Sequence, residues 1–126
     1  MSETRRFSKP VLAALTKATI LGVRSGTEHR FTGVWMVVVN GRLFVRSWND
    51  KATGWRRAFL EDPRGTIQLL SGRRIRVRAR TVTGERLLAA VDAAYASKYH
   101  TAASQKWVRG LSRGRRRRTT TELVPL

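Results

Sequence analysis

Residues 34–48 read VWMVVVNGRLFVRSW, and this stretch decides which fold to expect. Every position from Val34 to Val39 is apolar, which is typical of a strand buried on both faces, as in a barrel or beneath a helix. Asn40-Gly41 then supplies the two positive φ angles that a two-residue hairpin requires. The chain from Leu43 to Trp48 is therefore expected to return as an antiparallel neighbour of the first strand.

Four more strands are expected around this hairpin. They fall at residues 17–23, 66–70, 73–82 and 119–124, where β-branched or alternating apolar residues gather. In the strand at 73–82 the side chains alternate between apolar residues and arginine, which is typical of a strand with one face in water. Mostly short connections between the strands favour antiparallel pairing.

Helical spacing of apolar residues predicts three helices, at residues 1–16, 55–60 and 85–99. The segment 100–118 is rich in arginine and is predicted to be an irregular basic loop before the closing strand. The length suits a single domain over residues 1–126. The order of elements favours an α+β fold, namely a small, mainly antiparallel β-barrel with peripheral helices.

The composition excludes several kinds of site. The chain has no cysteine, so disulfides, thiolate metal sites and cysteine nucleophiles are excluded, and a cytoplasmic location is expected. His29 and His100 lie far apart and lack carboxylate partners at metal spacing, so no metal is expected. No run of about 18 apolar residues occurs, so no membrane segment is expected. No acid–base pair or nucleophile motif identifies a catalytic residue.

Charge is the most unusual property of the chain. Lys and Arg number 26 against eight Asp and Glu, which gives a formal net charge of +18. Such an excess attracts polyanions and phosphate-bearing ligands, and it specifies no fold. The cations are spread along the chain instead of forming one tail, so part of the charge is expected to be a general surface property.

A set of short motifs surrounds the hairpin. Gly22-x-Arg24-Ser25-Gly26 forms a basic glycine turn, and after a strand ending at Ser47 the chain reads Trp55-x-Arg57-x-x-Leu60-x-x-Pro63. This arrangement resembles the deazaflavin-dependent nitroreductases. They belong to the split β-barrel superfamily of pyridoxamine-phosphate-oxidase-like flavin-binding proteins, and the chain resembles an uncharacterised branch of that superfamily more closely.

The resemblance implies a six-stranded split β-barrel that forms a homodimer, binds FMN or a deazaflavin and acts as an oxidoreductase on an unassigned substrate. The cofactor would carry the hydride chemistry, so the lack of a catalytic motif leaves open whether the chain is an enzyme. The resemblance places cations and hydroxyls around cofactor phosphate and two tryptophans beside the ring. The implied cofactor-binding residues are Arg24, Ser25, Arg30, Ser47, Trp48, Asn49, Lys51, Trp55 and Arg56.

The same residues also have simpler interpretations. Turns containing glycine and serine are common between strands, so Arg24 and Ser25 can form an ordinary polar turn. Trp35 stands in the all-apolar strand and can pack in the core, and Trp55 can pack between a helix and the barrel. Of these three tryptophans, Trp48 follows a polar strand end and is the one most expected to be exposed.

A second function stays open, that of a non-enzymatic protein that binds nucleic acid or another polyanion. Two basic patches support it, the row at 73–80 and the segment 106–118, where Trp107 could stack on a base. No known nucleic-acid-binding motif accompanies them, and each patch can instead be a solvated surface. The residues of this alternative are Arg74, Arg76, Arg78, Arg80, Lys106, Arg115, Arg116, Arg117 and Arg118.

Overall fold

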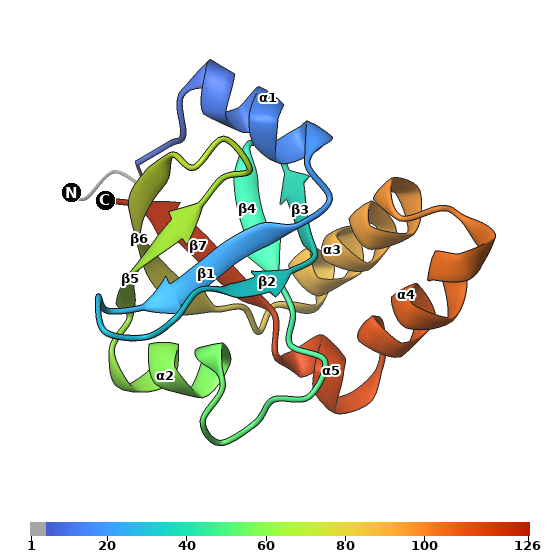
Figure 1. The fold of residues 1–126 in the computed structure, drawn as a ribbon. Helices are drawn as coiled ribbons and strands as arrows, with labels where there is room; N and C mark the ends of the chain where they lie inside the picture. The colour runs from blue at the N-terminus through green and yellow to red at the C-terminus, as the bar shows by residue number, and fades with distance from the viewer. Residues whose placement is uncertain (1–4) are drawn as a thin grey trace.

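The computed structural model describes residues 5–126, which form one seven-stranded antiparallel sheet and five α-helices (Figure 1). The strand order in the sheet is β2-β1-β5-β6-β7-β4-β3. The elements are α1 (Lys9–Lys17), β1 (Leu21–Ser25), β2 (Thr32–Val34), β3 (Met36–Val39), β4 (Arg42–Val45), α2 (Trp55–Glu61), β5 (Arg64–Gln68), β6 (Arg74–Thr81), α3 (Glu85–Lys98), the short 3-10 helix η1 (Ala102–Ser104), α4 (Gln105–Leu111), α5 (Gly114–Arg118) and β7 (Thr121–Pro125).

The sheet is curled into a nearly closed barrel. Its two edge strands, β2 and β3, are separated in the chain by Trp35 alone, so the two edges of the sheet must meet there (Figure 1). β2 pairs with β1 and β3 pairs with β4, so the two strands are two halves of one bent segment that brings the sheet edges together. The predicted α+β split barrel is confirmed. It has seven strands instead of six because the strand expected at 34–39 is interrupted at Trp35.

Tyr95 of α3 and Tyr99, the residue that caps the C-terminal end of α3, explain this interruption. Tyr95 Oη donates a hydrogen bond to the Trp35 carbonyl oxygen at 3.0 Å, and Tyr99 Oη accepts one from Met36 N at 3.0 Å. The backbone at the break is therefore bonded to a helix instead of a neighbouring strand. Burial raises the pKa of Tyr99 to about 12 and also raises the pKa of Tyr95. Both hydroxyls consequently keep their protons near neutral pH.

The hairpin between β3 and β4 is the clearest success of the sequence pattern. Asn40 and Gly41 adopt φ angles of 51° and 74°, and Val39 pairs with Arg42 across the turn. Asparagine and glycine tolerate this left-handed conformation better than other residues, which is why the turn forms here. The closing strand predicted at 119–124 is confirmed as β7, which pairs with both β4 and β6.

The core has two layers, and together they account for the all-apolar stretch in β3. One buried cluster fills the barrel and includes Met36, Leu43 and Ile67. The other lies between the outer face of β3 and β4 and the helices α3 and α4, and it includes Val37 and Phe44. Successive residues of a strand point to opposite faces. The strand is therefore apolar at every position because the barrel covers one face and α3 covers the other.

Helix α1 lies across one end of the barrel (Figure 1). Ser8 caps it, since Val11 N donates to Ser8 Oγ at 3.4 Å, and Val11 and Leu15 are buried against the barrel core. The helix predicted over residues 1–16 therefore begins later, at Lys9. Residues 5–8 are not helical, and the first four residues of that prediction lie outside the described part of the chain.

The prediction of an irregular loop at 100–118 is wrong, because this segment forms η1, α4 and α5. Val108 and Leu111 are three residues apart on α4, and both are buried in the cluster beneath α3. Gly110 lets the helix approach Trp48 closely, since a Cβ built at Gly110 would lie 2.6 Å from the indole ring. Tertiary contacts therefore make a helix from a stretch whose glycines and repeated arginines look irregular in sequence.

Candidate functional site

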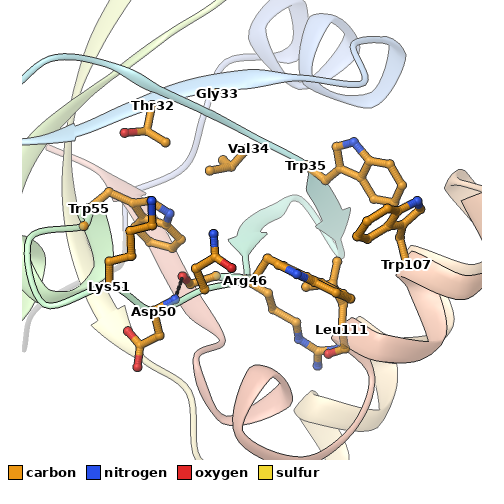
Figure 2. A pocket seen from close by; sticks show the side chains of 14 residues that line it. Thr32, Gly33, Val34, Trp35, Arg46, Asp50, Lys51, Trp55, Trp107 and Leu111 are labelled. Atoms are coloured by element: carbon orange, nitrogen blue, oxygen red, sulfur yellow. Dashed lines mark hydrogen bonds between the residues drawn. The ribbon is translucent and has the colours of Figure 1, made fainter.

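A cavity of about 550 Å³ lies where the chain leaves β4. Its walls come from β2 and Trp35, from the segment 46–54 that joins β4 to α2 together with Trp55 at the start of α2, and from α4 (Figure 2). All four tryptophans of the chain line this cavity. The lining residues are Thr32, Gly33, Val34, Trp35, Arg46, Ser47, Trp48, Asn49, Asp50, Lys51, Gly54, Trp55, Trp107 and Leu111.

The segment after β4 is held in place by its own polar side chains. Ser47 Oγ accepts a hydrogen bond from Asp50 N at 2.8 Å, drawn as a dashed line in Figure 2. The Asp50 carboxylate accepts bonds from Arg56 at 2.9 Å and Arg57 at 3.1 Å. Burial alone would raise the pKa of Asp50, but the two guanidinium groups lower it on balance. Asp50 therefore stays charged and ties this wall of the cavity to α2.

Trp48 is held between an arginine and a second tryptophan. The Arg116 guanidinium carbon lies 3.6 Å from the ring centroid of Trp48, a close cation–π contact. Trp107 of α4 meets Trp48 edge to face, with ring centroids 4.9 Å apart. Trp48 and Trp35 are both partly buried and Trp55 is buried, so none of these three is exposed, whereas Trp107 keeps 42% of its surface exposed.

The other two tryptophans are supported by rings that do not line the cavity. Trp35 stacks on Tyr99 with ring centroids 4.2 Å apart and planes within 2° of parallel. Trp55 is buried at the start of α2 and meets Phe59 edge to face at 6.2 Å. The aromatic walls are therefore oriented by the protein itself, which limits the entropy lost when a ligand binds.

Arg46 lines the base of the cavity and is almost fully buried, with 3% of its surface exposed. Its Nη1 donates to Asp92 Oδ1 at 2.6 Å, and its Nε donates to Thr120 Oγ1 at 2.8 Å. Further bonds reach the carbonyl oxygens of Leu111 and Leu88. Figure 2 shows the side chain of Arg46 running toward Leu111. This cation consequently joins β4 to α3 and α4, and most of its donors are used within the protein.

Five of the nine residues implied by the resemblance line the cavity. Ser47 has its hydroxyl engaged by Asp50 N, and its own N–H donates to Thr119 Oγ1 at 2.8 Å. Lys51 is exposed, and no hydrogen bond or ion pair within residues 5–126 engages its ammonium group, so it is available to an anionic ligand. The five residues are Ser47, Trp48, Asn49, Lys51 and Trp55.

Arg24 and Arg30 lie outside the cavity. The Arg24 guanidinium lies over the Phe31 ring at 4.3 Å from its centroid, and its Nε is buried without a hydrogen-bond partner in the described chain. Arg30 is exposed in the connection between β1 and β2. The structure of one chain therefore does not bring these two cations to the tryptophans.

Ser25 and Arg56 also lie outside the lining, and each has a structural contact. Ser25 is buried, and its hydroxyl lies 2.7 Å from the Asp62 carbonyl oxygen and 3.1 Å from that of Ala58 at the end of α2. It therefore fastens β1 to α2. Arg56 belongs to the pair of arginines on Asp50 that shapes the segment after β4.

Sequence reasoning missed the wall contributed by α4, together with Arg46 and Thr32. Trp107 and Leu111 are four residues apart and so share one face of the helix. That spacing was the available signal, but Gly110 and the arginines around it indicated a loop. No sequence signal identified Arg46, because an arginine at a strand end is ordinarily solvated.

The basic run at the end of the proposed loop is partly used inside the fold. Arg116 stacks on Trp48 and donates to its carbonyl oxygen at 2.9 Å. Arg117 Nε donates to Asp92 Oδ2 at 2.9 Å, and its terminal nitrogens bind Glu85. Of the other residues named for polyanion binding in this segment, the exposed ones are Lys106, Arg115 and Arg118.

The arginine row on β6 is exposed, as the alternating pattern predicted. Arg74 donates to Gln68 Oε1 at 3.2 Å, and Arg80 binds the Glu122 carboxylate at 2.8 Å. No carboxylate within residues 5–126 forms an ion pair with Arg76 or Arg78. The row on β6 is therefore largely free to bind a ligand, whereas Arg116 and Arg117 of the segment 106–118 are engaged within the protein.

Residues 5–126 contain no group of three or more His, Cys, Asp or Glu side chains arranged to hold a metal ion. Within the same residues, no helix has the length and apolar character needed to span a membrane.

Solved structures share this fold at low sequence identity. HutZ, the heme storage protein of Vibrio cholerae, matches with a TM-score of 0.70 and 13% identity over 96% of this chain and 91% of its own. An FAD-binding protein from Mesorhizobium loti matches at 0.53 and 16% over 99% and 93%. A candidate pyridoxamine 5'-phosphate oxidase from Listeria innocua matches at 0.58 and 10% over 93% and 90%. At these identities the likenesses show a shared split-barrel fold and nothing narrower.

Sequence comparison gives a narrower assignment than the fold does. None of the curated proteins matches the chain. Residues 12–123 match the model of one family, described as an uncharacterized protein conserved in bacteria, DUF2255. The match runs from within α1 to within β7, and so includes β1 to β6, part of β7 and the whole lining of the tryptophan cavity. The protein is therefore a member of the DUF2255 family.

Proposed function

We propose that the tryptophan cavity binds a flavin-type cofactor, FMN or a deazaflavin, and that the protein is an oxidoreductase of this cofactor. One observation carries the proposal: the only four tryptophans of the chain, from three separate segments, converge on one cavity. Aromatic faces stack favourably on flat ring systems, so such a lining suits an isoalloxazine-like ring. The cavity volume of about 550 Å³ lies in the range typical of small-molecule sites.

The donor set favours a flat organic ring over haem. Haem iron is usually held by His, Cys, Met or Tyr side chains. None of these occurs among the residues that line the cavity, and His29 and His100 lie elsewhere. The fold likeness to a heme storage protein and to an FAD-binding protein supports cofactor binding in general, and the lining chemistry favours the flavin type.

Five of the lining residues would contact the cofactor in three different ways. Trp48, Trp55 and Trp107 would border the ring and exclude water, and the free Lys51 ammonium would meet a phosphate or another anionic group. Asn49 can donate or accept hydrogen bonds at the ring edge. The bound cofactor would supply the hydride chemistry, while the protein supplies binding, orientation and electrostatics. The resemblance to the deazaflavin-dependent nitroreductases supports a deazaflavin, and the substrate is unassigned.

We also propose a symmetric homodimer. Arg24 and Arg30, two of the cations that the resemblance assigns to phosphate, do not reach the cavity of their own chain. A second subunit could complete the phosphate site with cations that a single cavity lacks. Two-fold dimers are the commonest closed assembly of soluble proteins. Light scattering with and without cofactor measures the assembly, and a monomer in both states would contradict the proposal.

The cofactor proposal is tested by fluorescence titration of nucleic-acid-free protein with FMN and with a deazaflavin, in about 0.15 M salt with heparin as a competitor. Saturable binding that resists heparin is expected. Trp107→Ala should weaken it by about three- to tenfold, because one stacking wall is lost. The matched control is Leu60→Ala, which removes an exposed apolar side chain outside the cavity. Equal affinity in both variants, or binding abolished by heparin, would contradict a ring site.

A non-enzymatic role in polyanion binding is the second candidate, and the exposed arginine row of β6 favours it. The same titration discriminates between the two functions. A ring-plus-phosphate site keeps most of its affinity at physiological salt, whereas polyanion binding by several arginines falls steeply as salt rises. Loss of oligonucleotide binding with salt, without any flavin binding, would support the second candidate.

A further inference from the structure

A second hollow lies at the opposite end of β4 from the tryptophan cavity. Arg42, the first residue of β4, lines this hollow, whereas the residues that follow β4 line the cavity. Its volume is about 540 Å³, and the two hollows share no lining residue. We call it the arginine cleft because four arginines line it around one carboxylate, namely Arg5, Arg6, Arg42 and Arg80 around Glu122.

Two of these arginines are held at fixed positions by Glu122. Arg42 Nε and Nη2 donate to the two oxygens of Glu122 at 2.9 and 2.8 Å, and Arg80 Nη2 donates to Oε1 at 2.8 Å. The three residues stand on neighbouring strands, β4, β7 and β6. The Glu122 side chain is 4% exposed, whereas those of Arg42 and Arg80 are 38% and 49% exposed. A buried anion thus supports two cations at the surface.

This arrangement leaves donors free. An arginine has five N–H groups, and the bonds to Glu122 use two from Arg42 and one from Arg80. Burial alone would raise the pKa of Glu122, but the two guanidinium groups lower it on balance. One charge on Glu122 is therefore shared by two arginines, and the four arginines of the cleft leave three positive charges in excess.

The other two arginines come from the segment before α1. Phe7 is 7% exposed and packs in the barrel core, so it fixes the backbone beside Arg5 and Arg6. Arg6 also lies over the β3–β4 turn, since its Nη1 would be 3.5 Å from a Cβ built at Gly41. Both side chains are exposed, and no carboxylate within residues 5–126 forms an ion pair with them. They can therefore close around an anion seated above Glu122.

We propose that the arginine cleft binds clustered phosphate groups, either a free oligophosphate such as the tail of a nucleoside triphosphate or the phosphates of a nucleic-acid backbone. Arginine suits phosphate because its planar fork donates two parallel hydrogen bonds to neighbouring oxygens. Several phosphates are needed to balance three excess charges. A second copy of the chain is disfavoured as the occupant, since a two-fold contact here would place arginines against arginines. The cleft does not depend on the proposed cofactor function.

The test uses the full chain and two probes, inorganic tripolyphosphate and an oligothymidylate of about eight nucleotides, titrated calorimetrically in about 0.15 M salt. The double variant Arg5→Ser/Arg6→Ser removes two charges from the cleft without touching the sheet. The matched control, Arg73→Ser/Arg86→Ser, removes two exposed arginines that do not line the cleft. A single variant, Arg80→Gln, removes one charge of the cleft that comes from the sheet and leaves the ion pair between Arg42 and Glu122 in place.

Stoichiometric binding of tripolyphosphate is expected, weakened about tenfold or more by Arg5→Ser/Arg6→Ser and by less than about twofold in the control. That result supports a free oligophosphate as ligand. If only the oligonucleotide binds, with the same dependence on the variants, the phosphates belong to nucleic acid. Equal losses in both double variants would overturn the proposal, since they would reflect net charge alone, and so would the absence of binding by either probe. Flavin binding should be unchanged in all variants.

Discussion

Two groups of arginines in this protein differ in their surroundings, since one is engaged inside the fold and the other faces water. The anchored group, Arg46, Arg116 and Arg117, lies between β4 and the helices α3 to α5, where carboxylates, carbonyl oxygens and an indole face receive its charges. The β6 row, Arg74 to Arg80, lies on the outer face of a strand and is largely solvated, with Glu122 as its single carboxylate partner in the described chain. The arginine content of a segment therefore does not indicate its role. Its position relative to acidic and aromatic groups does.

The largest loss of stability is expected on replacing Arg46 of the anchored group. Arg46→Met removes a cation whose side chain is fully buried and leaves Asp92 and two carbonyl oxygens with fewer partners. Removing one partner of a buried ion pair costs about 3 to 5 kcal/mol. We expect a corresponding fall in the free energy of unfolding, measured by urea denaturation. An effect below about 1 kcal/mol would show that Arg117 alone satisfies Asp92.

The second largest loss of stability is expected on replacing Gly110 of α4. A Cβ at this position would lie 2.6 Å from two carbons of the Trp48 ring. Gly110→Ala therefore forces Trp48 or α4 to move, at a cost of about 1 to 3 kcal/mol, which exceeds the gain in helix propensity. The control is Gly84→Ala, where the added methyl group meets nothing within 4 Å. A stable Gly110→Ala protein with unchanged tryptophan fluorescence would contradict the packing of Trp48 against α4.

A smaller loss of stability is expected at acid pH, when Glu122 becomes protonated. Glu122 is the carboxylate that pairs with Arg80 of the β6 row. The pKa of Glu122 is lowered on balance, because hydrogen bonds from Arg42 and Arg80 outweigh the effect of burial. A lowered pKa contributes stability above the unfolded value, about 4.3, that is lost as the pH falls through the folded value. We expect wild type to be more stable than Glu122→Gln at neutral pH and the gap to close on acidification. Thermal melts of both proteins between about pH 3 and 7 measure this difference in stability. A difference that does not change with pH would contradict a stabilising charge on Glu122.

The smallest effect is expected within the β6 row itself. Arg78 is exposed, pairs across the strands with Arg64 and has no acidic partner within residues 5–126. Arg78→Ala should change the free energy of unfolding by no more than about 0.5 kcal/mol, and relief of the repulsion from Arg64 can make the change stabilising. Urea denaturation beside Arg46→Met measures both ends of the comparison. A loss above about 1 kcal/mol would mean that the row carries a structural contact.

The sequence predicted the barrel and part of its site because local rules were obeyed there. Asn40-Gly41 allows one tight turn, and an all-apolar strand can only be a strand covered on both sides. Ser47, Lys51 and Trp55 follow that hairpin directly, so their place beside a strand end was predictable, and they line the cavity. These features depend on residues adjacent in the chain.

The burial of Arg46 and the helical structure of residues 100–118 depend on groups that are distant in the chain. Only the tertiary structure could therefore reveal them. Arg46 is buried because Asp92 and Thr120, 46 and 74 residues away, meet it across α3 and the start of β7. The segment 100–118 becomes helical because Val108 and Leu111 find an apolar surface under α3. The chain alone determined a basic, cysteine-free split barrel with a tryptophan-rich strand end. Which of its arginines are internal and which face water was decided by folding, because a charge is stabilised by whatever opposite charge or ring the fold brings beside it.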